Sequence, residues 1–150
     1  MPELPEVETV RLGLEERLVG RTVTGFDVRL AKQFKSDPKL IKTQIVGAKV
    51  RKLDRRAKLL IIDLSSGYSL LIHLKMTGQL IWQDEGDHRF AGGHPIPFVD
   101  GPLPASTTHI VVSFDDGARL FFNDLRQFGY AKLVPTAEVE EQSFLKGLGP

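Results

Sequence analysis

Short apolar runs separated by turn residues fill most of this chain, and they limit its fold more than any other feature. Residues 59–62 are all branched and apolar, for example, and Ser65-Ser66-Gly67 then separates this run from the next. Runs of this length bounded by small polar residues predict β-strands, and Asp116-Gly117 supplies a hairpin turn between two of them. The predicted strands lie at residues 21–30, 48–54, 58–64, 68–74, 79–83, 109–114, 118–123 and 128–134.

Helical periodicity is confined to the ends of the chain and one internal segment. Apolar residues at helical spacing followed by Gly20 predict an amphipathic helix over about residues 5–19. A short helix is predicted over 37–46, with Asp37 as its N-cap, and another after Pro135. Many short strands with two or three helices predict an α+β fold: a two-layer antiparallel β-sandwich flanked by an N-terminal helix and one or two further helices.

Residues 84–107 do not follow this pattern. They contain four Pro, four Gly and two His without periodicity, so no strand is predicted there. A stretch of this length without regular structure is usually a functional or mobile loop. His88 and His94 are six residues apart with no carboxylate frame, which predicts exposed side chains rather than metal ligands.

Composition excludes several classes of protein. With 150 residues, of which 41% are hydrophobic, the chain suits one domain with a real core. It has no apolar run of about 18 residues, as a membrane span requires, and its acidic start is unlike a signal peptide. We therefore expect a cytoplasmic protein without membrane contact. The chain has no cysteine, which excludes disulfides, thiolate-bound zinc and a thiol nucleophile.

Charge is sorted along the sequence although the net charge is only +1. Residues 21–75 contain thirteen Lys or Arg against four Asp. A basic stripe of this kind is typical of a phosphate-binding face, and a solvated sheet face is the alternative. The stripe consists of Lys49, Arg51, Lys52, Arg55, Arg56 and Lys58.

The first residues suggest chemistry. A small residue after Met1 normally allows removal of the initiator, which would leave Pro2 as the N-terminus. Its secondary amine would have a pKa of about 7.7–8.0, so an unprotonated fraction could attack a sugar C1′ and form an imine. Glu3 could move protons beside it. The alternative is that Pro2 and Pro5 only keep the chain extended before the helix.

The start of the chain, Pro2-Glu3-Leu4-Pro5-Glu6-Val7-Glu8, resembles that of formamidopyrimidine-DNA glycosylases, bacterial base-excision enzymes related to endonuclease VIII. Three further motifs agree with this family in order, and the resemblance covers essentially the whole chain. They are Arg55-Arg56-Ala57-Lys58, His73-Leu74-Lys75-Met76-Thr77-Gly78 and Asp124-Leu125-Arg126-Gln127-Phe128-Gly129.

The resemblance implies that residues 1–150 are the N-terminal catalytic domain of such an enzyme. The family's helix-two-turn-helix and zinc-finger regions are absent from this sequence, so we expect no zinc or other cofactor in this chain. The chain alone should then bind DNA weakly, and it could be inactive by itself.

The implied activity is base-excision repair of damaged double-stranded DNA by a monomeric glycosylase and AP lyase. Oxidised purines, namely formamidopyrimidine and 8-oxoguanine opposite cytosine, are the implied substrates. Pro2 would form an imine at C1′, Glu3 would protonate the sugar ring oxygen, and β,δ-elimination would cut the strand. Lys58 completes the catalytic group, and Glu6 would support it through hydrogen bonds.

The resemblance also assigns DNA contacts. Met76, Arg126 and Phe128 would fill the space left by a flipped nucleotide, and we call them the filling residues. Met is a flexible apolar side chain, Phe can insert between base steps, and Arg can bond to the orphaned cytosine. Lys58 and His73 would bind the flanking phosphates, and His109 would lie near the DNA backbone.

Two positions depart from the family pattern. Leu125 stands where many members carry Pro, and Gln127 stands where a second basic residue is common, so one phosphate contact would be lost. Three alternatives remain open at this stage. They are an endonuclease VIII-like glycosylase for oxidised pyrimidines, a non-catalytic DNA-binding β-sandwich, and an N-terminal-proline tautomerase.

Overall fold

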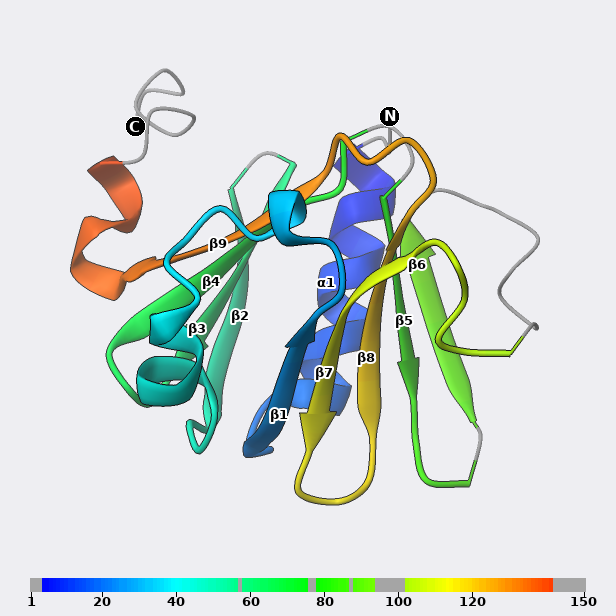
Figure 1. Cartoon of the computed structure of the whole chain (residues 1–150), viewed down its shortest axis with the longest axis horizontal. Helices are drawn as coiled ribbons and strands as arrows, with labels where there is room; N and C mark the ends of the chain where they lie inside the picture. Colours follow the sequence, from blue (N-terminus) through cyan, green and yellow to red (C-terminus); the bar gives the residue numbers. More distant parts are fainter. Residues whose placement is uncertain (1–3, 57, 76–77, 87, 94–101, 142–150) are drawn as a thin grey trace.

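Two antiparallel sheets face one another, with a helix along one side (Figure 1). The computed structural model describes residues 4–56, 58–75, 78–86, 88–93 and 102–141. The helix is α1 (Leu4–Leu18). The strands are β1 (Val23–Val28), β2 (Val50–Arg56), β3 (Leu59–Leu64), β4 (Tyr68–His73), β5 (Gly78–Gln83), β6 (Arg89–Gly93), β7 (Thr108–Phe114), β8 (Arg119–Asp124) and β9 (Tyr130–Pro135).

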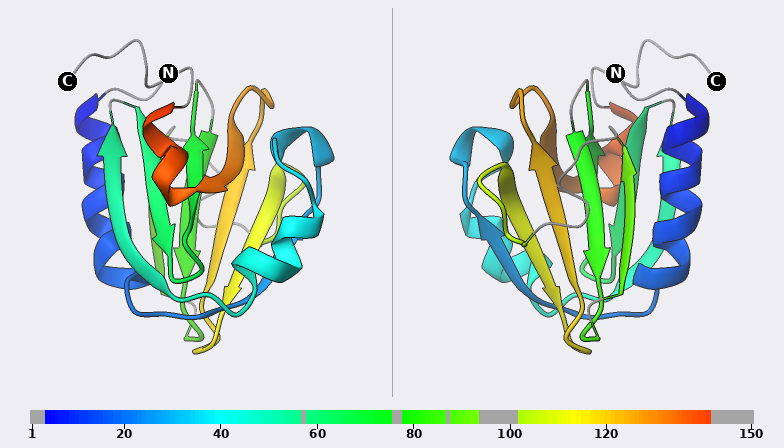
Figure 2. Two further views of the ribbon diagram at one scale, coloured as in Figure 1. Left: turned by 90° about the vertical axis from the view of Figure 1, so that its left-hand side faces the viewer. Right: turned by 90° about the vertical axis from the view of Figure 1, so that its right-hand side faces the viewer.

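The order of strands explains the place of α1. One sheet has the order β1-β7-β8-β5-β6 and the other β2-β3-β4-β9. Helix α1 contacts β2 and β6, an edge strand of each sheet, and so covers two edges that would otherwise be open (Figure 2). The predicted α+β sandwich with an N-terminal helix is therefore confirmed.

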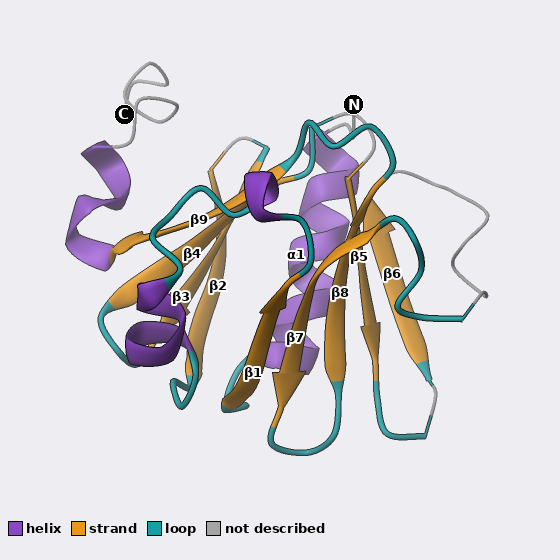
Figure 3. Cartoon of the chain, in the orientation of Figure 1, coloured by secondary structure: helices purple, strands orange, loops and turns teal. Residues whose placement is uncertain are grey.

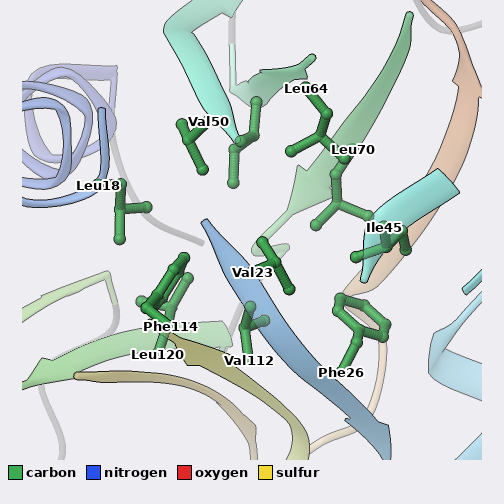
Figure 4. A pocket seen from close by; sticks show the side chains of 11 residues that line it. Leu18, Val23, Phe26, Ile45, Val50, Leu64, Leu70, Val112, Phe114 and Leu120 are labelled. Carbon is green, nitrogen blue, oxygen red and sulfur yellow. The ribbon is translucent and has the colours of Figure 1, made fainter. Parts of the chain in front are cut away.

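The core lies between the sheets and α1. The inward residues of the strands alternate with outward ones, and the apolar stripe of the helix faces them. Burying each such side chain contributes about 1.5–3 kcal/mol. A small apolar cavity of about 20 Å³ remains where Leu18, Val23, Val50 and Val112 meet (Figure 4). An apolar cavity of this size is expected to stay dry.

Strand β6 corrects the sequence prediction for residues 84–107. It pairs with β5, with Trp82 opposite Phe90. Phe90 lies against Gly13 of α1, where a Cβ atom would come within 2.1 Å of the ring. The guanidinium of Arg17 lies 4.4 Å from the centre of the same ring. The strand has only five residues and ends in two glycines, so its stability comes from long-range contacts that periodicity cannot reveal.

Two short helices lie where the sequence predicts them, although neither is a regular α-helix (Figure 3). Asp37 accepts a hydrogen bond from the backbone N–H of Lys39 at 2.9 Å, as a cap should, and the helical residues 39–45 that follow are mostly the π-helical turn η2 (Ile41–Ile45). The segment after Pro135 forms the 3-10 helix η4 (Thr136–Glu141), and η1 (Ala31–Gln33) is a further 3-10 turn that the sequence did not indicate. None of the helices in the described part of the chain is long and apolar enough to cross a membrane.

Candidate nucleic-acid interface

One end of the sandwich brings together most of the predicted contacts that the structure describes. In the register of the sheets, Leu59 lies opposite His73, and His73 lies opposite Tyr130. Gly78, which begins β5, lies opposite Asp124, which ends β8. The ends of β2, β4 and β8 and the starts of β3, β5 and β9 therefore lie at the end of the sandwich where α1 begins, at the top of Figure 1.

The β8–β9 turn presents two of the filling residues to solvent. Phe128 is 58% exposed, and the Arg126 guanidinium carbon lies 5.4 Å from the centre of its ring. Leu125 in the same turn is 57% exposed. Ordinary core packing therefore does not explain Phe128. The predicted strand at 128–134 begins two residues later, because Gly129 N–H bonds to the Asp124 carboxylate, at 2.7 Å, and not to a neighbouring strand.

Two residues hold a backbone conformation that side chains disfavour. Among the described residues other than glycine, Lys75 and Gln127 have positive φ angles, of 54° and 63°. Such a conformation costs roughly 1–3 kcal/mol and persists only where the surroundings impose it. Lys75 directly precedes Met76, and Gln127 directly precedes Phe128. Met76 itself lies outside the described residues.

His73 is buried and supports the β4–β5 turn. Its Nδ1 accepts a hydrogen bond from the backbone N–H of Lys75 at 3.1 Å. Burial, which contributes most, and the nearby charges of Lys75 and Lys58 together lower the pKa of His73 to about 4. The ring is therefore neutral at pH 7, with its proton on Nε2. Lys58 and His73, predicted to bind adjacent phosphates, are close enough to interact.

His109 lies beneath the β8–β9 turn and not on an open surface. It is only 8% exposed, and its Nε2 lies 3.1 Å from the backbone oxygen of Asp124. A carbonyl oxygen can only accept, so Nε2–H donates. The structure thus places His109 where it supports the residues of the turn.

The first turns of α1 are tied to β2 by charge. Glu8 accepts hydrogen bonds from Arg11 at 2.7 Å and from Arg55 at 2.8 Å. These bonds lower the pKa of Glu8 to about 2, Arg11 contributing most. Sequence reasoning missed this pair, although the opposite charges of the two motifs could have suggested it. Pro2 and Glu3 lie outside the described residues, as does the Glu6 side chain, so their roles stay predictions.

Comparison with known proteins now decides the family. A family model described as the formamidopyrimidine-DNA glycosylase N-terminal domain matches residues 1–131. This chain belongs to that family. A formamidopyrimidine-DNA glycosylase of Rhodopseudomonas palustris (strain BisB18) is 44% identical over the whole chain, which covers 50% of that relative.

Solved structures of formamidopyrimidine-DNA glycosylases agree in fold. The wild-type Lactococcus lactis Fpg (MutM), in complex with a DNA that contains N7-benzyl-Fapy-dG, superposes with a TM-score of 0.78 at 30% identity, covering 97% of this chain and 48% of its own. MutM in complex with carbocyclic 8-oxo-G DNA gives 0.77 at 29% identity, covering 93% and 46%. This chain spans about half the length of these relatives.

The basic stripe of this glycosylase-family chain is partly neutralised. Arg55 pairs with Glu8, Arg56 pairs with Glu140, and the Lys52 Nζ lies 3.0 Å from the Asp54 carboxylate. Lys49, directly before β2, and Arg51, within it, are exposed. The stripe is therefore not the continuous phosphate-binding face that the sequence suggested. Two lysines, Lys58 and Lys75, lie close enough to His73 to interact with it, at the end of the sandwich.

The described residues offer no cluster that could hold a metal. No group of three His, Asp or Glu side chains comes together in the ranges that the structure covers. His88 is exposed, as predicted, and its Nδ1 lies 3.1 Å from the Asp84 carboxylate. His94 lies outside the described residues.

Proposed function

We propose that this chain is the catalytic domain of a bifunctional DNA glycosylase and AP lyase that removes oxidised purines. The observation that carries the proposal is the β8–β9 turn, where exposed Phe128 and Arg126 project from a buried polar base. An enzyme that flips a nucleotide out of a duplex needs side chains of these two types to fill the gap.

The proposed chemistry starts at the N-terminal amine. The nitrogen of Pro2 forms a bond to C1′ with its lone pair, and the damaged base leaves with the electron pair of its bond to C1′. The proton that the nitrogen then loses is taken up by the departing base. The C1′–O4′ bond then breaks while Glu3 gives a proton to O4′ and the nitrogen lone pair forms a double bond to C1′. Because proline is a secondary amine, the product is an iminium ion without a proton on nitrogen. Loss of a C2′ proton expels the 3′ phosphate, and a second elimination expels the 5′ phosphate.

The DNA contacts are proposed from the end of the sandwich. Phe128 and Met76 would enter the base stack, and Arg126 would bond to the unpaired cytosine. Lys58 would supply positive charge to a phosphate beside the flipped nucleotide, and His73 would act there as a neutral ring. We propose that the protein acts as a monomer on damaged double-stranded DNA in the bacterial cytoplasm.

Oxidised purines are proposed as substrates from two relatives. The structures described above hold DNA with a formamidopyrimidine derivative and with an 8-oxoguanine analogue. These ligands belong to the relatives, and they support the same class of lesion for this chain.

Borohydride trapping tests the proposal. The complete gene product, its Pro2→Gly variant and residues 1–150 alone would be incubated with a duplex that contains 8-oxoguanine opposite cytosine, and an intact mass would establish whether Met1 is removed. We expect a covalent adduct that requires Pro2. If the complete protein forms no adduct on this lesion, on an oxidised pyrimidine or on an abasic site, the non-catalytic DNA-binding alternative replaces the proposal.

A further inference from the structure

We infer that Gln33 is a positioning residue, which fixes the β8–β9 turn through Asp124 so that Arg126 and Phe128 meet the DNA correctly. The inference rests on the proposed function of these two side chains. Gln33 ends η1 and is 91 residues away from Asp124 in the sequence, so no motif links them.

The contacts join both ends of the turn to one side chain. Gln33 is fully buried, and its Nε2 donates to the Asp124 carboxylate at 2.8 Å and to the Gly129 backbone oxygen at 3.1 Å. The same carboxylate oxygen of Asp124 accepts the Gly129 backbone N–H at 2.7 Å. The amide and the carboxylate therefore close the turn from both sides.

The carboxylate needs these donors because it is fully buried. A buried charge without hydrogen bonds is strongly unfavourable, so Asp124 would be expected to rearrange if Gln33 stopped donating. Gly129 leaves little room for another arrangement. A Cβ atom there would lie 2.8 Å from the His73 backbone oxygen and 2.9 Å from the Asp124 carboxylate.

Further bonds hold the base of the turn while its tip stays in solvent. The Asp124 backbone N–H donates to Thr107 at 2.9 Å, and His109 donates to the Asp124 backbone oxygen. The His109 backbone oxygen in turn accepts the Arg29 N–H at 2.7 Å, just before η1. Side chains that must enter a base stack at a defined position need a rigid support of this kind.

Stability alone does not explain the choice of Gln33. Its Oε1 is buried and has no hydrogen-bond partner within the described part of the chain. Such an unsatisfied atom is unfavourable, and an apolar side chain would avoid it. The glutamine provides an amide N–H group that donates to Asp124 and to Gly129, at the two ends of the turn.

The test compares Gln33→Leu with the matched control Gln83→Leu in the complete protein. Gln83 is also buried, but it lies at the opposite end of β5. Single-turnover excision of 8-oxoguanine from a paired duplex would be measured beside adduct formation at an abasic site, where no base must be displaced. We expect Gln33→Leu to slow excision by about tenfold and abasic-site trapping by less than about twofold. Gln83→Leu should leave this ratio unchanged.

Each outcome is decisive. If Gln33→Leu slows excision and abasic-site trapping equally, or slows neither, the positioning role is wrong. The activity of the wild type would in that case still support the proposed function. If the wild type acts on neither substrate, the proposed function fails, and hydrogen exchange still tests the inference, because Gln33→Leu should increase exchange in residues 125–129.

A second variant covers the case in which Gln33→Leu does not fold. Gln33→Glu would place a second carboxyl group beside Asp124, and one of the two must be protonated to form the hydrogen bond. We expect Gln33→Glu to slow the excision of 8-oxoguanine more than it slows abasic-site trapping. Equal defects on the two substrates would contradict the inference.

Discussion

The ring of His73 lies in the interior of the protein, and its surroundings keep it uncharged. The residue ends β4 beside Lys75, and its Nδ1 accepts a hydrogen bond instead of carrying a proton. A positive charge on this ring would be both desolvated and close to two lysines. The arrangement makes His73 a structural support for the turn before Met76, and it gives the protein a defined response to acid.

We predict that the free energy of unfolding falls as the pH is lowered from 6.5 to 4. The pKa of His73 is about 4 in the folded protein and 6.5 in the unfolded chain, so between these values the unfolded state binds a proton that the folded state does not. The loss should reach about 3 kcal/mol below pH 4. Urea unfolding at several pH values measures it. His73→Asn should remove this slope, whereas exposed His88→Asn should retain it.

We predict that Phe128→Ala lowers the activity of the protein while leaving its stability almost unchanged. The ring is mostly exposed, so its removal should change the unfolding free energy by less than about 0.5 kcal/mol. Excision of 8-oxoguanine by the complete protein should nevertheless fall by roughly tenfold or more, since the gap left by the flipped base is no longer filled. Thermal unfolding and single-turnover kinetics provide the two measurements. A stable variant with full activity would show that Phe128 has no such role.

Between elements, the contact of α1 with β6 closes the sandwich. Gly13 allows the Phe90 ring to lie directly on the helix, and the Arg17 guanidinium lies over the same ring. Glycine inside a helix costs about 1 kcal/mol relative to alanine, so its presence here has a packing reason.

We predict that Gly13→Ala destabilises the protein in spite of the gain in helix propensity. The new methyl group would lie 2.1 Å from the present position of Phe90, so the ring must move away from α1. A net loss of about 1–3 kcal/mol is expected from such overpacking. Leu12→Ala on the exposed side of the same helix is the control and should change stability little. An increase in stability for Gly13→Ala in urea unfolding would show that the ring moves freely.

For the whole molecule, Lys58, Lys75 and the exposed β8–β9 turn lie at one end. The chain covers about half the length of its relatives. The end near His73 carries Lys58 and Lys75, whereas Lys49 lies before β2, at the far end of that strand. Because each neutralised phosphate releases counterions, the salt dependence of DNA binding reports where the cations act.

We predict weak, salt-dependent binding of residues 1–150 to duplex DNA. Lys75→Gln should make the slope of log K against log salt less steep by about 0.9, the value for one phosphate contact. Lys49→Gln should leave the slope unchanged. Fluorescence anisotropy at several salt concentrations measures both. Equal effects of the two substitutions would indicate a diffuse field in place of a defined DNA-binding end.

Local sequence patterns were sufficient to predict much of the secondary structure of this molecule. The periodicity of residues 5–19 and the alternation of short apolar runs predicted α1, eight of the strands and the two-layer sandwich, because burial on one face imposes a period along the chain. The motifs around His73 and Phe128 identified the family, which the comparison confirmed.

Tertiary structure decided the rest, because the deciding contacts join residues far apart in the sequence. Strand β6 exists through Phe90 on Gly13, and Gln33 acquires its role only when η1 reaches Asp124. The burial of His109 and the exposure of Phe128 likewise follow from where the β8–β9 turn closes. The sequence alone determined eight of the strands and the family to which the chain belongs. Only the folded chain determined the ninth strand and what supports the residues that would meet DNA, because the contacts responsible join distant parts of the sequence.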